Sequence, residues 1–153
     1  MNMKGPLFYS KILLFGEYGI IKDSKGLSIP YNFYNGALKV DENPSEEAIR
    51  SNNSLKRFAD YLKNLETENP GLVNFDFESL YSDIDKGMYF DSSIPQGYGV
   101  GSSGALVAAI YDEYALDKIT VLENLTREKL LKLKRSLAPW NLFSTESPRV
   151  SIR

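Results

Sequence analysis

Residues 95–105 read Pro-Gln-Gly-Tyr-Gly-Val-Gly-Ser-Ser-Gly-Ala, and the apolar run Leu-Val-Ala-Ala-Ile-Tyr follows them. The glycines and serines predict a loop, and the apolar run predicts the first turns of a helix. The N–H groups and the dipole of a helix N-terminus favour an anion, and glycine lets the main chain approach it closely. A serine could cap the helix, and a serine hydroxyl could also bind a metal ion. The stretch therefore predicts a phosphate-binding loop.

This stretch differs from the two commonest phosphate loops. A P-loop ends in Gly-Lys-Ser/Thr, whereas no lysine occurs between Lys86 and Lys118. The dinucleotide-binding fingerprint Gly-x-Gly-x-x-Gly follows a buried strand. Residues 88–96 contain Asp91, two serines and a proline, so they predict a poor central strand. From the glycines alone, a flexible surface loop before a serine-capped helix is an equally good interpretation.

The spacing Pro-x-Gly-x-Gly-x-Gly-Ser-Ser closely resembles the ATP loop of the GHMP superfamily of kinases, which act on galactose, homoserine, mevalonate and phosphomevalonate. The segment Lys-Ile-Leu-Leu-Phe-Gly-Glu-Tyr at residues 11–18 resembles the superfamily's opening Lys-x-x-Leu-Phe-Gly-Glu-His segment. Residues 7–38, which include Ile29-Pro30-Tyr31, are most similar to mevalonate kinases of the kind found in Bacteroidetes-type bacteria. The resemblance covers residues 4–134. It implies an α+β fold, the N-terminal domain of these kinases, in which helices back a mixed sheet.

The resemblance also implies roles for individual residues. Lys11 would be the catalytic residue near the transferred phosphate, and Glu17 and Tyr18 would contact the acceptor. Tyr18 replaces the histidine that is usual in the family, and Gly104 replaces a frequent alanine. The hydroxyl of Ser103 would bind Mg²⁺. The expected ATP-binding residues are Pro95, Gly97, Gly99, Val100, Gly101, Ser102, Ser103 and Gly104.

The composition limits the chemistry and the partners. The chain has no histidine and no cysteine, which excludes imidazole bases, thiol nucleophiles and ordinary zinc sites. Phosphoryl transfer needs positioning and charge neutralisation, which main-chain amides, a lysine and Mg²⁺ can supply. A net charge of −2 without a basic cluster argues against nucleic acid and anionic membranes as partners. Because no long apolar run and no signal-peptide core are found, a cytoplasmic protein is expected.

Periodicity predicts the elements of a single globular domain. The strands are predicted at residues 7–16, 27–30, 36–40 and 73–77. The helices are predicted at residues 54–65, 102–114 and 126–134. Residues 23–26 predict a turn, and residues 41–54 predict a polar loop that leads into the first helix. The apolar stripe of that first helix predicts core packing.

The C-terminal residues 135–153 show no clear period and no likeness to the family. Mevalonate kinases carry a His-Gly-x-x-Ser-Gly-x-Asp segment near here, whose aspartate is the proposed base, and a magnesium-binding glutamate upstream. If the third base of each codon is joined to the next two, Trp140 and Asn141 give glutamate. The junctions that follow permit Ser-Phe-Phe-His-Gly-Lys-Ser-Ser-Gly-Ile-Asp-Pro, up to Arg153. We therefore expect a frameshift at or shortly after Lys134, with a kinase domain at residues 1–134 and a non-native tail at residues 135–153; a genuinely divergent tail is the alternative.

The expected family function is ATP-dependent phosphorylation of mevalonate to phosphomevalonate, an early step of isoprenoid synthesis. The chain would be an inactive N-terminal half, because the second domain, the base and one metal ligand are missing; the full-length enzyme could be a homodimer. One alternative is another kinase of the superfamily, acting on homoserine, a sugar or phosphomevalonate. The other is a non-catalytic module that binds protein or RNA.

Overall fold

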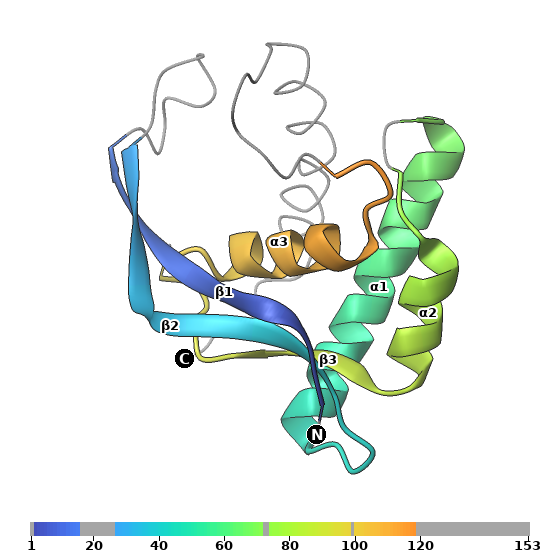
Figure 1. The fold of residues 1–153 in the computed structure, drawn as a ribbon, viewed down its shortest axis with the longest axis horizontal. Coiled ribbons are helices and arrows are strands. Elements are labelled where there is room, and N and C mark those ends of the chain that lie inside the picture. Colours follow the sequence, from blue (N-terminus) through green and yellow to red (C-terminus); the bar gives the residue numbers. More distant parts are fainter. Residues whose placement is uncertain (1, 16–26, 72–73, 99, 119–153) are drawn as a thin grey trace.

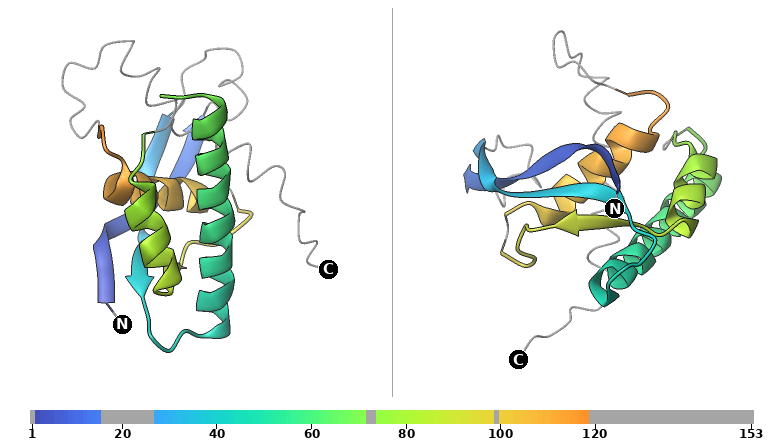
Figure 2. Two further views of the ribbon diagram at one scale, coloured as in Figure 1. Left: turned by 90° about the vertical axis from the view of Figure 1, so that its right-hand side faces the viewer. Right: turned by 60° about the horizontal axis from the view of Figure 1, so that its bottom comes forward.

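A computed structural model describes residues 2–15, 27–71, 74–98 and 100–118. The elements are β1 (Asn2–Phe15), β2 (Leu27–Val40), α1 (Glu46–Glu68), α2 (Phe77–Asp85), β3 (Met88–Ser92) and α3 (Ser102–Tyr114). The strands form one sheet in the order β1-β2-β3. Figures 1 and 2 show α1 and α2 side by side next to β3, whereas α3 packs against β1 and β2. The expected α+β fold is confirmed, although the described strands pair antiparallel throughout and form no mixed sheet.

The long hairpin of β1 and β2 contains a wide bulge. Tyr9 is the register partner of Asn35, but the next residue, Ser10, is the partner of Tyr31, so residues 32–34 protrude from β2. The rings of Tyr31 and Phe33 stack at a centroid distance of 5.4 Å across the bulge. The two strands predicted at residues 27–30 and 36–40 are therefore one strand with an interruption. The strand predicted at residues 7–16 begins earlier, at Asn2.

Helix α1 starts well before its predicted beginning at residue 54. Ser45 is the N-cap, and its side chain accepts a hydrogen bond from the Ala48 N–H at 3.2 Å. Glu46 and Glu47 in the first turn stabilise the same end through the helix dipole. The second half of the predicted loop at residues 41–54 is thus wrong, because capping extends the helix through a polar stretch.

Helix α2 replaces most of the strand predicted at residues 73–77. In the described part of that segment, only Phe75 forms a β-bridge, to Ala115. Asp76 then caps α2 by accepting the Ser79 N–H at 3.0 Å, and the helix begins at Phe77. The Asp-x-x-Ser pattern is a capping signal that could have predicted this start.

The core lies between the sheet and the three helices. Leu38 of β2 and Met88 of β3 are fully buried, as are apolar residues of each helix. The helical members of this core include Leu55, Phe58, Ala59 and Leu62 of α1, Leu80 and Ile84 of α2, and Ala109 and Ile110 of α3. The predicted core packing of the first helix is confirmed. In the described ranges, no helix is both long and apolar enough to cross a membrane.

Candidate functional site

The N-terminus of α3 presents open main-chain amides. Gly101 is the N-cap, with φ 87° and ψ 24°, and no side chain caps the helix. The first helical bond runs from the Ala105 N–H to the Gly101 carbonyl at 3.0 Å. The N–H groups of Ser102, Ser103 and Gly104 precede this bond and have no acceptor within the helix. The helix bounds predicted at residues 102–114 are confirmed, but the predicted serine cap is wrong, because a left-handed glycine occupies the cap position.

The structure brings Lys11 of β1 against this open helix end. The Lys11 N–H donates to the Val100 carbonyl at 3.0 Å. A Cβ at Gly101 would lie 2.9 Å from Lys11 Cγ and 3.6 Å from Lys11 Cε, so the lysine side chain crosses the glycine. Within the described residues, no carboxylate forms an ion pair with Lys11. A positive charge without a protein partner therefore lies beside the open amides.

Pro30 of β2 helps to explain this arrangement. It is the register partner of Lys11 and has no N–H to donate. The N–H of Lys11 bonds instead to Val100, as expected if Lys11 and Pro30 are a non-hydrogen-bonded antiparallel pair. The end of the glycine-rich loop is thus attached to the edge of β1 that faces away from β2.

The beginning of the same loop is attached to β2. The Ser93 N–H donates to the Asn35 carbonyl at 2.9 Å. Gly97 has φ +83° and open space around its Cβ position, and the neighbouring Tyr98 is 80% exposed. Among the expected site residues, Glu17, Tyr18 and Gly99 lie outside the described residues, as do the turn at 23–26, the helix at 126–134 and the tail.

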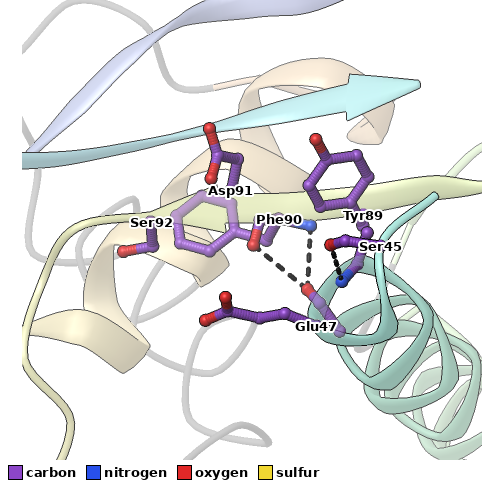
Figure 3. A pocket seen from close by; sticks show the side chains of 8 residues that line it. Ser45, Glu47, Tyr89, Phe90, Asp91 and Ser92 are labelled. Carbon is purple, nitrogen blue, oxygen red and sulfur yellow. Dashed lines mark hydrogen bonds between the residues drawn. The ribbon is translucent and has the colours of Figure 1, made fainter. Parts of the chain in front are cut away.

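A cavity of about 190 Å³ lies between the N-terminus of α1 and β3 (Figure 3). Its lining residues are Ser45, Glu47, Ala48, Ser51, Tyr89, Phe90, Asp91 and Ser92. Strand β3 ends at Ser92 and leads directly into the loop that begins before Pro95, so cavity and loop adjoin along the chain. The sequence analysis missed these residues, because the cavity forms only where two separate elements meet.

The polar groups of the cavity are unequally satisfied. The Ser51 hydroxyl accepts from the Phe90 N–H at 3.0 Å and donates to the Phe90 carbonyl at 3.1 Å. Asp91 pairs with Lys39, and this hydrogen bond raises the pKa of Lys39. Glu47 forms no ion pair with a cation of the described ranges, and Figure 3 shows it extending below β3 toward Ser92.

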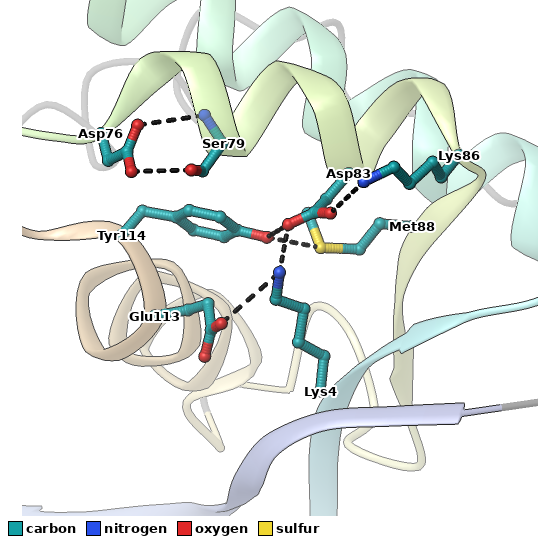
Figure 4. Close-up of polar contacts among 8 residues, drawn as sticks. All are labelled: Lys4, Asp76, Ser79, Asp83, Lys86, Met88, Glu113 and Tyr114. Carbon is teal, nitrogen blue, oxygen red and sulfur yellow. Dashed lines mark hydrogen bonds and ion pairs between the residues drawn. The ribbon is translucent and has the colours of Figure 1, made fainter.

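A second polar cluster lies at the C-terminal end of α3 (Figure 4). Asp83 of α2 accepts a hydrogen bond from the Tyr114 hydroxyl at 2.9 Å and forms an ion pair with Lys4 of β1. Lys4 also lies 3.5 Å from Glu113. Burial alone would raise the pKa of Asp83, but the hydrogen bonds from Lys4 and Tyr114 outweigh it and lower the pKa. Because its members satisfy one another, this cluster serves stability.

The open helix end, the glycine-rich loop and the adjacent lysine define a phosphate-binding α+β domain. The family model "GHMP kinases N terminal domain" matches residues 53–139, which are 87 of the 153 residues. The chain therefore belongs to the GHMP kinases, a family of phosphotransferases that use ATP. Searches of curated proteins and of solved structures gave no match. The match ends at residue 139, and the domain boundary after Lys134 stays a prediction.

Proposed function

We propose that this kinase transfers the γ-phosphate of ATP to the primary alcohol of mevalonate. The observation that carries the phosphate site is the contact between Lys11 and Gly101 at the open N-terminus of α3. Mevalonate as the acceptor rests on the resemblance of residues 7–38 to mevalonate kinases, and Glu17 and Tyr18 are the residues proposed to contact it. Homoserine, a sugar or phosphomevalonate is the alternative acceptor within the same family.

The groups at this helix end fit a triphosphate. Three open amides, at Ser102, Ser103 and Gly104, donate hydrogen bonds to oxygens, and the Lys11 ammonium neutralises charge. Within the described ranges, no three carboxylates gather to hold a metal ion. The Ser103 hydroxyl would therefore give Mg²⁺ one hard oxygen ligand, and phosphate oxygens would give others. When bound, the nucleotide supplies the phosphoryl group, and the protein supplies position and charge.

The cavity beside β3 is proposed to hold the nucleotide base. It adjoins the start of the phosphate loop, so a nucleotide that lies along β3 reaches from one to the other. At about 190 Å³ the cavity is smaller than the roughly 300–1,000 Å³ of pockets that enclose whole ligands. It is therefore suited to one part of a nucleotide.

The phosphate site is tested by calorimetric titration of the purified chain with MgATP and with adenosine. Lys11→Met removes the charge at the helix end, and we expect ATP to bind about tenfold more weakly or worse, with adenosine little changed. Lys56→Met is the matched control, since it removes an exposed charge that is 4.0 Å from Asp85 on α1. Equal ATP affinities in the two variants would contradict phosphate binding at Lys11 and favour a non-catalytic module.

The acceptor is tested by ADP release with mevalonate, homoserine, galactose and phosphomevalonate. Because a frameshift is expected after Lys134, the gene is first resequenced across the codons for residues 129–141, and the resulting product is assayed. The fastest turnover is expected with mevalonate. Faster turnover with another alcohol would assign the kinase to that acceptor instead.

A further inference from the structure

We infer that the outer edge of β3 reads the nucleotide base. The main-chain N–H and C=O of Ser92 would bind the edge of the base, and the Glu47 carboxylate would accept a hydrogen bond from its exocyclic amine. The cavity would then select a 6-aminopurine over a 6-oxopurine. This inference rests on the proposed nucleotide site and adds the groups that choose the base.

The orientation of Ser92 follows from the contacts of β3 with α1. In an antiparallel strand, successive residues direct their main-chain N–H and C=O to opposite sides. Ser51 of α1 bonds both the N–H and the C=O of Phe90, and Asn52 of α1 donates to the Met88 carbonyl at 2.6 Å. Met88 and Phe90 therefore face α1, away from β2. Ser92 is two residues further along the strand and faces the same side.

The other neighbour of Ser92 supports this orientation. The Ser93 N–H donates to the Asn35 carbonyl of β2, so Ser93 faces β2 and Ser92 faces away from it. Ser92 lies in the register opposite Gly36, as the last residue of β3. In the described ranges, α1 supplies Ser51 to Phe90 and Asn52 to Met88, but no side chain to the main chain of Ser92. One donor and one acceptor are therefore left at the cavity.

This donor and acceptor match the edge of adenine. Adenine presents an amine next to a ring nitrogen that accepts, and these groups can replace the N–H and C=O of a neighbouring strand. The amine has two hydrogens, so one can bond the Ser92 carbonyl and the other a second acceptor. An ionised carboxylate only accepts, which suits an amine and repels the 6-oxygen of a 6-oxopurine.

Glu47 is the carboxylate that is placed to be this second acceptor. Both Glu47 and Asp91 line the cavity, but Asp91 is already paired with Lys39. Figure 3 shows the Glu47 side chain directed along β3 toward Ser92. The adjacent Glu46 does not line the cavity; its side chain is 93% exposed, and a carboxylate oxygen lies 3.8 Å from Arg50. Glu46 therefore offers a matched control on the same helical turn.

The test measures the affinities of the full chain for ATP and for inosine triphosphate, which carries an oxygen in place of the amine. We expect the wild type to bind ATP at least tenfold more tightly. In Glu47→Gln, the new amide can donate to the 6-oxygen, so the ratio of the two affinities should fall toward one. Glu46→Gln should keep the wild-type ratio. A general loss of folded protein lowers both affinities equally and leaves the ratio unchanged.

The outcomes separate this inference from the proposed function. If ATP and inosine triphosphate bind equally well and both need Lys11, the phosphate site stands and base reading by Glu47 is wrong. If Glu47→Gln keeps the wild-type preference for ATP, the base is read by other groups and the inference is overturned. If neither nucleotide binds the wild-type chain, the proposed function and this inference both fail.

Discussion

The two ends of α3 are built in opposite ways. At the N-terminus, Gly101 has a left-handed backbone, no side chain caps the helix, and Lys11 lies alongside. At the C-terminus, Tyr114 is 2% exposed and its hydroxyl is hydrogen-bonded to Asp83. One end leaves its polar groups open, and the other satisfies them within the protein.

This difference shows how one helix can both anchor and bind. Open amides at a helix N-terminus are useful only if no protein group occupies them, so that end adds little to stability. A buried polar group without a partner costs roughly 1–3 kcal/mol, so the buried end needs the complete cluster around Asp83. We therefore expect substitutions at the first end to affect ligand binding and substitutions at the second to affect stability.

The largest effect on binding is expected for Gly101→Val. The residue has φ +87°, and a new Cβ would come within 2.9 Å of Lys11 Cγ, so both the loop and the lysine must move. ATP affinity, measured by calorimetry, should fall by more than about tenfold, or roughly 1.4 kcal/mol. Gly71→Val is the control, because φ is +84° there too, nothing lies within 4 Å, and the residue follows α1. Equal loss of binding in both variants would attribute it to general destabilisation.

At the other end, Asp83→Asn should lower the free energy of unfolding by about 1.5–3 kcal/mol, because Lys4 and Tyr114 lose a charged partner. The folded protein should still bind ATP like the wild type. Urea unfolding measures the change, and Asp85→Asn on the same helix is the control. Asp85 is 70% exposed and 4.0 Å from Lys56, so its loss should cost at most about 0.5 kcal/mol. Similar costs for both variants would show that the cluster is no anchor.

The same pair gives stability a definite pH dependence. The pKa of Asp83 is lowered from 3.8, so its contribution is present above that value and is lost as the pH falls through the folded pKa. Burial opposes the charge on Lys4, but Asp83 outweighs it and raises the pKa above 10.5. The Lys4 contribution is thus present below that value and is lost as the pH rises further. Unfolding of the wild type and Asp83→Asn as a function of pH should show a difference that shrinks in acid.

The smallest effect is expected for Gly104→Ala in the first turn of α3. Its φ is not in the left-handed region, and a Cβ would meet no atom within 4 Å. Alanine should therefore stabilise the helix by about 0.5–1 kcal/mol, which is measured as a rise in Tm. A lower Tm would mean that the open helix end tolerates no side chain at this position.

Some of the fold could be predicted from local signals. The glycine-to-apolar transition at Gly101 predicted the bounds of α3, and the apolar spacing in residues 54–65 predicted the buried face of α1. The start of α2 was missed although its capping pattern is local. The bulge at residues 32–34 could not be predicted, since it depends on which residues of β1 and β2 are partners.

The sequence by itself determined the open helix end, because glycine freedom and apolar periodicity act within a few residues along the chain. Only the tertiary structure decided that Lys11 crosses Gly101 and that Glu47 lies below β3. It also decided that Ser92 turns its main chain to the cavity. Each of these depends on strand register or on helix packing between distant segments, which local propensities do not set.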